Sequence, residues 1–138
     1  MRGVFALSLI GIVVACPAAA VVAQMQFSAL SGLERGEWEL KERGNETLAR
    51  RLCIGDPGQL LQPLHAGRQC KRYVLENTAR RAAVTYDCAQ AGQGRTQVRV
   101  ETARLVQIDS QGVSGGAPFD IAMEGRRVGA CKGSALGR

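Results

Sequence analysis

The sequence contains few aromatic residues, a single histidine and no closely spaced pair of cysteines. Aromatic side chains make up 4% of the 138 residues, which is too few for a platform that stacks bases or for an aromatic cage around a cation. The single His65 excludes zinc sites that need two imidazole ligands. The cysteines include no Cys-x-x-Cys motif, which argues against a thioredoxin-like redox centre. We therefore expect neither a bound metal nor a cofactor.

Catalytic motifs are missing from the sequence as well. The chain has no Gly-x-Ser-x-Gly elbow and no phosphate-binding loop that leads through a lysine into a helix. We expect His65 to be a surface or helix-capping residue rather than a ligand or base. Glu37 and Glu39 have the spacing of an acid–base pair, but that spacing is more typical of the solvated side of an edge strand. We expect no catalytic residues, and a small hydrolase or redox enzyme is the least favoured interpretation.

Residues 1–23 have the pattern of a secretory signal peptide. Arg2 supplies the positive charge, an apolar run covers residues 4–15, and small residues precede the expected cleavage site before Gln24. The apolar run is too short for a membrane span, so we expect no transmembrane segment in the mature chain. The protein is therefore predicted to be periplasmic. The alternative is a lipoprotein acylated at Cys16, because the residues before this cysteine loosely match a lipoprotein signal.

Four cysteines remain after the expected cleavage, and an even number in a small exported chain indicates two disulfides. Four cysteines allow three pairings. Cys70 and Cys88 lie at the outer ends of an expected hairpin, so we favour a bond between them. Cys131 then bonds Cys53 and joins the end of the domain to its beginning, which stabilises the fold by roughly 4 kcal/mol if the bond mainly restricts the unfolded chain. The scattered spacing of the cysteines argues against a zinc site.

Short segments of alternating hydrophobicity, separated by turns, indicate β-strands. The clearest alternation covers residues 95–102, where Thr96, Val98 and Val100 share one face. One short helix is expected to begin at Asp56, because an aspartate followed by proline is a typical helix start. We predict a mostly β fold: a single curved antiparallel meander of about seven strands, with one short helix and two disulfides.

The length of the chain allows one small domain. Residues 24–36 are expected to form a flexible lead-in, residues 37–131 the disulfide-crosslinked β domain, and residues 132–138 a loose tail. An apolar small ligand is expected to bind on the concave face of the sheet. The residues predicted to line that apolar face are Trp38, Val98, Val100 and Phe119.

The chain is basic, with a formal net charge of +6. Basic pairs recur along it, but adjacent residues of a strand point to opposite faces, so a pair is not a patch by itself. Arg95 and Arg99 share a face, and together with Arg126 they are the predicted anion-binding residues. Nucleic acid is not an expected partner, because export and the scarcity of aromatic side chains argue against it.

The most specific patterns stand at the two ends of the expected domain. Gly36-Glu37-Trp38-Glu39 opens the first strand, and Gly125-Arg126-Arg127-Val128-Gly129-Ala130-Cys131 closes the last, with spaced cysteines between them. This combination resembles the domain-of-unknown-function 3617 family of small exported bacterial proteins over most of residues 33–131. The chain departs from that family in lacking a methionine-rich stretch after the first strand. The resemblance implies export, a cysteine framework and a β fold, and it transfers no catalytic residue.

The favoured interpretation is a non-enzymatic envelope or periplasmic protein that binds an apolar small ligand or an envelope component. The alternative is a basic module that binds an anionic envelope polymer or lipid. Strong dependence of binding on salt would favour the basic module. Binding of apolar probes with little dependence on salt would favour the apolar ligand.

Overall fold

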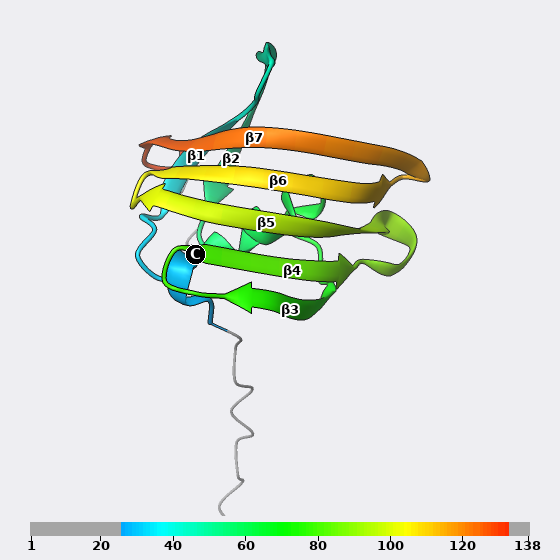
Figure 1. The fold of residues 1–138 in the computed structure, drawn as a ribbon. Coiled ribbons are helices and arrows are strands. Elements are labelled where there is room, and N and C mark those ends of the chain that lie inside the picture. The colour runs from blue at the N-terminus through cyan, green and yellow to red at the C-terminus, as the bar shows by residue number, and fades with distance from the viewer. Residues whose placement is uncertain (1–25, 133–138) are drawn as a thin grey trace, which may run out of the picture.

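The computed structural model describes residues 26–132, which form one seven-stranded antiparallel sheet (Figure 1). The strands are β1 (Gly36–Glu42), β2 (Asn45–Ile54), β3 (Lys71–Asn77), β4 (Arg81–Asp87), β5 (Gly92–Thr102), β6 (Leu105–Ser114) and β7 (Ala117–Gly129). The helices are four short 3₁₀ segments, η1 (Ser28–Leu30), η2 (Pro57–Leu61), η3 (Pro63–His65) and η4 (Ala89–Ala91). The predicted mostly β fold is confirmed. The helix expected after Asp56 is η2, and the Asp56 carboxylate accepts a hydrogen bond from the Gly58 amide (2.9 Å).

The strand order is β2-β1-β7-β6-β5-β4-β3. Strands β3 to β7 form a meander in which each strand pairs with the next, and β7 then pairs with β1 instead of ending the sheet. Strands β2 and β3 follow one another in the chain but lie at opposite edges. The described sheet is therefore open, and the connection over residues 55–70 crosses its inner face.

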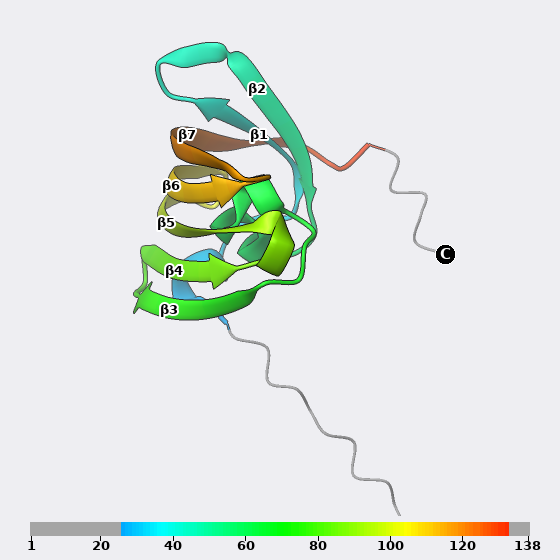
Figure 2. The ribbon, with the colours of Figure 1, turned by 90° about the vertical axis from the view of Figure 1, so that its right-hand side faces the viewer.

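The core lies between the inner face of the sheet and this connection. Trp38 and Leu40 point inward from β1, as their alternation with charged residues predicts, and Leu60 and Leu61 of η2 are buried against the sheet. Figure 2 shows η1 and η2 on the same side of the curved sheet. Complete burial of an apolar side chain of this size contributes about 1.5–3 kcal/mol, so the crossing connection is a structural part of the core.

Residues 27–33 also belong to the core, which corrects the expected flexible lead-in over residues 24–36. Phe27, Leu30 and Leu33 are buried, and η1 contacts β4 and β5. These three residues recur every third position, which is the spacing of a 3₁₀ turn with one apolar side. The expected signal peptide and the expected tail beyond Lys132 lie outside the described residues.

Glycines on β5 and β6 allow the two paired strands to approach closely. Gly92 has φ of 129° and Gly112 has φ of 159°, conformations that a residue with a side chain rarely adopts. A Cβ at Gly112 would lie 2.1 Å from the carbonyl oxygen of Gln93, and one at Gly92 would lie 2.0 Å from that of Val113. Only glycine fits at these points, which curve the sheet around its core.

Both predicted disulfides are present. Cys70 and Cys88 directly flank the paired residues Lys71 and Asp87 of the β3–β4 hairpin, with their Cα atoms 4.3 Å apart. Cys53 of β2 bonds Cys131 after β7, with Cα atoms 5.3 Å apart. The second bond joins the β1–β2 hairpin to the end of β7. It therefore crosslinks this hairpin to the meander formed by β3 to β7.

Candidate functional site

The predicted apolar face is not an open ligand site. Trp38 and Val98 are both 0% exposed, because η1 and η2 cover the inner face at these positions. Val100 is half-buried against the same core, and half-buried Phe119 lies apart from it, beside His65, with ring centroids 6.4 Å apart. The physical reason is that the chain fills its own concavity with the connection over residues 55–70. The described part of the chain leaves no free apolar face there.

The three predicted anion-binding arginines lie on the outer face of the sheet but do not form one patch. Arg99 pairs with Glu101 (3.0 Å) on β5, and Arg126 pairs with Glu124 (3.1 Å) on β7. Strand β6 separates the two arginines. Of the three, Arg95 alone has no ion pair among the described residues. The predicted trio is therefore corrected, and Arg95 is the member that retains an available charge.

Cations without a carboxylate partner gather at the β3–β4 end of the sheet. The structure shows no ion pair for the following residues: Arg68, Lys71, Arg80, Arg81 and Arg95. All five are exposed. Towards the other end of the sheet, carboxylates pair with Lys41, Arg43, Arg51, Arg104, Arg126 and Arg127. Arg35, Arg50 and Lys132 are also exposed and have no ion pair among the described residues. The β3–β4 end therefore carries the larger group of unpaired cations, but not all of them.

Strand β3 places three consecutive exposed apolar side chains within this group of cations. Tyr73 is 62% exposed, Val74 40% and Leu75 50%. β3 is an edge strand, so no further strand covers these side chains. We define the β3–β4 margin as these three residues together with the five unpaired cations. Such a run of exposed apolar residues is uncommon on a soluble surface and indicates a contact surface.

Sequence reasoning missed this surface because it treated the basic pairs as residues on opposite faces of a strand. Arg80 precedes β4 and Arg81 opens it, and both are exposed. Because Arg80 lies in the turn and not in a strand, the rule that adjacent residues point to opposite faces does not apply to this pair, and both side chains are exposed. The available signal was an apolar run without alternation, residues 73–75, between two basic pairs in the sequence.

A shallow hollow of about 530 Å³ lies on the outer face next to Tyr73. Tyr73, Thr85, Arg95 and Gln111 line it, and they occupy successive paired positions across β3, β4, β5 and β6. Gly94 and Gly112 form part of its floor. The hollow thus presents a guanidinium, hydroxyls and amides, which are groups that donate hydrogen bonds to oxyanions. The carboxylate of Asp87 also lines it and opposes the binding of an anion there.

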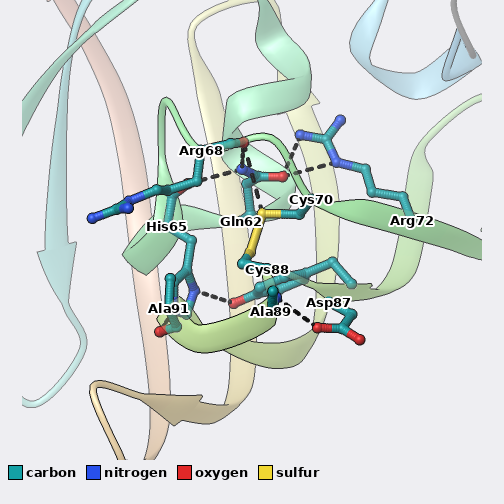
Figure 3. Close-up of a disulfide and its surroundings, with 10 residues drawn as sticks. Gln62, His65, Arg68, Cys70, Arg72, Asp87, Cys88, Ala89 and Ala91 are labelled. Atoms are coloured by element: carbon teal, nitrogen blue, oxygen red, sulfur yellow. Dashed lines mark hydrogen bonds between the residues drawn. A yellow bond between two sulfur atoms is a disulfide. The ribbon is translucent and has the colours of Figure 1, made fainter.

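The buried amide of Gln62 fixes β3 to the connection that crosses the core (Figure 3). Its Nε2 donates to the carbonyls of His65 (2.8 Å) and Arg68 (2.7 Å), while its Oε1 accepts from Arg72 Nε (3.0 Å) and Nη2 (2.6 Å). Burial lowers the pKa of Arg72, and the negative charge of Asp56 opposes that effect. Arg72 is therefore a structural cation, unlike the exposed cations of the margin.

His65 is a buried residue with both ring nitrogens satisfied, which corrects the expected surface or capping role. It is 4% exposed; its Nε2 lies 2.9 Å from the Ala91 carbonyl and its Nδ1 lies 3.1 Å from the Tyr86 hydroxyl. The carbonyl can only accept, so Nε2 carries the proton and Nδ1 accepts from Tyr86. Burial raises the pKa of Tyr86, and hydrogen bonds with the hydroxyls of Ser110 and Thr96 partly oppose this increase. This arrangement is that of a satisfied core histidine.

The carboxylates Glu37 and Glu39 serve as ion-pair partners. Glu37 pairs with Arg51, and Glu39 pairs with both Arg51 and Lys41. The hydrogen bond from Lys41 lowers the pKa of Glu39, with burial opposing and Arg51 adding to the effect. A general acid needs a raised pKa, so Glu39 is unsuited to that role. Strand β1 lies between β2 and β7 and is not the expected edge strand.

The described residues contain no group of three or more His, Cys, Asp or Glu side chains placed to hold a metal ion. No helix within residues 26–132 is long and apolar enough to cross a membrane.

Comparison of the chain with family models, curated proteins and solved structures finds no match. The resemblance to the domain-of-unknown-function 3617 family therefore stays a prediction from residues 36–39 and 125–131. Function is inferred from the surface chemistry of residues 26–132.

Proposed function

We propose that the protein is an exported, non-enzymatic protein that binds an anionic component of the cell envelope through the β3–β4 margin. The observation that carries this proposal is the group of unpaired cations beside the exposed apolar residues of β3. Five exposed cations at the margin have no carboxylate partner among the described residues, whereas seven cations towards the other end of the sheet form ion pairs and three more (Arg35, Arg50 and Lys132) are unpaired but lie outside the margin. Unneutralised charge on one edge attracts and orients a polyanion.

The proposal of export is supported by the two disulfides and by the pattern of residues 1–23. Disulfides form and persist in oxidising compartments such as the periplasm. The leader pattern directs the chain there, either as a free protein that begins at Gln24 or as a lipoprotein acylated at Cys16. Both forms place the described domain in contact with the envelope.

An anionic partner is favoured over an apolar small ligand because of how the inner face is filled. The side chains of Leu60 and Leu61 occupy the position that such a ligand would need. Binding there would require displacement of η2 and loss of its core contacts. The margin, in contrast, is exposed without any rearrangement.

The test is the salt concentration at which the protein elutes from immobilised heparin, used as a soluble polyanion probe. In the margin variant, four cations are replaced by glutamine: Lys71, Arg80, Arg81 and Arg95. In the matched control, four cations that form ion pairs are replaced by glutamine: Lys41, Arg43, Arg99 and Arg126. Both variants lose the same formal charge.

We expect the margin variant to elute at clearly lower salt than the control, because each cation in contact with the polyanion adds to the salt dependence of binding. Equal elution of the two variants would show that net charge alone determines binding and would refute the margin as a site. Failure of the native protein to bind at low salt would refute the proposed function itself.

A further inference from the structure

The exposed apolar side chains of β3 lie between cations on both sides. Arg68 and Lys71 precede them, and Arg80 and Arg81 follow at the hairpin turn. A polyanion in water gains little from contact with Tyr73, Val74 and Leu75, since it offers no apolar phase. An anionic bilayer offers both partners, with headgroup phosphates for the cations and an acyl boundary for the apolar side chains.

We infer that the partner of the β3–β4 margin is the surface of an anionic lipid bilayer, into whose interfacial region Tyr73, Val74 and Leu75 insert. This inference rests on the proposed function and specifies its ligand. Each exposed cation near such a surface strengthens binding about fivefold. Transfer of the exposed parts of Val74 and Leu75 from water adds about tenfold in total.

The backbone of β3 argues for a bilayer rather than an added strand from another chain. Pairing between β3 and β4 shifts register between Val74 and Glu76. A bulge at this point bends the edge and interrupts the regular row of amides and carbonyls that strand addition requires. The same bulge places two successive apolar residues, Val74 and Leu75, at the exposed edge.

The outer-face hollow beside Tyr73 completes the surface. Thr85, Arg95 and Gln111 present donors there, one, two and three strands inward from the edge. A phosphate that enters the hollow while Tyr73 inserts would accept hydrogen bonds from Arg95. A free phosphate carries the same chemistry, so the tests must distinguish it from a headgroup that is part of a bilayer.

The chain enters the domain at the same edge. Asn77, the last residue of β3, accepts a hydrogen bond from the Ser28 amide (2.9 Å) and donates one to the Gln26 carbonyl (3.2 Å). Gln26 is therefore held at the end of β3.

The first experiment measures sedimentation with phosphatidylethanolamine vesicles that contain phosphatidylglycerol. The double variant Val74→Ser/Leu75→Ser is compared with Val128→Ser, which alters an exposed apolar residue (42% exposed) on β7. We expect the β3 variant to bind vesicles about tenfold more weakly and the control to bind normally. Inorganic phosphate is added in a parallel series, and we expect it to leave vesicle binding intact at matched ionic strength.

The outcomes separate this inference from the proposed function. Unchanged vesicle binding by the β3 variant, with heparin binding retained, would refute bilayer insertion and leave the polyanion proposal standing. Loss of heparin binding in the same folded variant would likewise refute the bilayer as the specific partner. If inorganic phosphate released the protein from vesicles at matched ionic strength, the hollow would be assigned to free phosphate and not to a lipid headgroup.

A second experiment reads insertion directly. The Leu75→Trp variant is mixed with vesicles whose acyl chains carry bromine, which quenches nearby tryptophan, while buried Trp38 provides a constant background. We expect quenching in Leu75→Trp and none above background in Val128→Trp. Absence of quenching in both would refute insertion. Formation of a dimer by the native protein in analytical ultracentrifugation, lost in Val74→Ser/Leu75→Ser, would assign the edge to a second copy instead.

Discussion

Arg81 of β4 lies directly opposite Arg99 of β5 on the outer face of the sheet. Like charges at directly opposed positions destabilise a sheet. Arg99 is neutralised by Glu101 (3.0 Å), whereas Arg81 has no ion pair among the described residues. Arg81 therefore forms no ion pair that would stabilise the sheet, and its charge is available to an anionic partner.

Replacement of Arg81 by threonine is expected to leave the free energy of unfolding unchanged or to raise it by about 0.2–1 kcal/mol, because it removes a repulsion and adds a β-branched residue. Heparin elution of the same variant should shift to lower salt. Thermal unfolding followed by circular dichroism measures the first effect. A loss of stability greater than about 1 kcal/mol would show that Arg81 makes a stabilising contact.

Alkaline pH is expected to destabilise the fold through Tyr86. Burial raises the pKa of this phenol above its ordinary value of 10.0. The folded state therefore keeps the proton at a pH where the unfolded state has lost it, so stability is fully present below pH 10.0 and falls as pH rises above it. Urea unfolding at several pH values measures the effect.

The control for this pH dependence is a pair of phenylalanine variants. Tyr86→Phe should lose about 1–3 kcal/mol at neutral pH, because Nδ1 of His65 loses its donor. It should also show a weaker decline above pH 10.0 than the native protein. Tyr73→Phe, at the exposed tyrosine, should show the native decline. A native decline in Tyr86→Phe would contradict the assignment.

Replacement of Gln62 by methionine is expected to cost about 2–5 kcal/mol. The variant leaves two carbonyls without the amide donor and leaves half-buried Arg72 without its acceptor. Exposed Gln90 provides the matched control, since Gln90→Met should change stability by less than about 0.5 kcal/mol. Similar stability of both variants would show that the connection over residues 55–70 does not depend on Gln62.

Replacement of Leu30 by alanine is expected to destabilise the protein by about 2–5 kcal/mol, the range typical of a leucine removed from a packed core. This test distinguishes a core segment from the flexible lead-in that the sequence suggested. Ser31→Ala, at the neighbouring exposed residue, provides the comparison. If Leu30→Ala had the same thermal unfolding temperature as the native protein, the packing of η1 against the sheet would be contradicted.

The intact mass of the protein recovered from a bacterial periplasm tests export and crosslinking together. We expect a chain that begins at Gln24, and reduction should raise its mass by four hydrogens, two for each disulfide. A mass that corresponds to an acylated Cys16 would establish the lipoprotein alternative. A chain that retains residues 1–23, or free thiols in folded protein, would contradict the proposal of export.

Local patterns predicted the individual strands and both disulfides. The alternation over residues 95–102 identified the inner face of β5, because a strand exposes every second side chain to the same environment. The pairing of Cys70 with Cys88 followed from a hairpin, which is a local structure. The burial of Phe27 and His65 was missed, since each depends on contacts with residues distant in sequence.

The candidate binding surface was predicted only in part. Sequence patterning selected Arg95, which has no ion pair among the described residues, but grouped it with Arg99 and Arg126, whose glutamate partners lie on the same strands. Periodicity identifies the face on which a side chain lies, but it does not tell whether a carboxylate is within reach. The exposure of Tyr73, Val74 and Leu75 depended on the position of β3 in the sheet.

The sequence by itself determined the mostly β class, the direction in which Trp38 and Val98 point, and the pairing of Cys70 with Cys88, because each depends on strand periodicity or on a local hairpin. Only the tertiary structure decided that β7 pairs with β1, and hence that β2 and β3 become the edges. That choice depends on contacts between residues far apart in the chain, which local periodicity does not record. It also decided which cations remain unpaired, and therefore where the protein presents its charge.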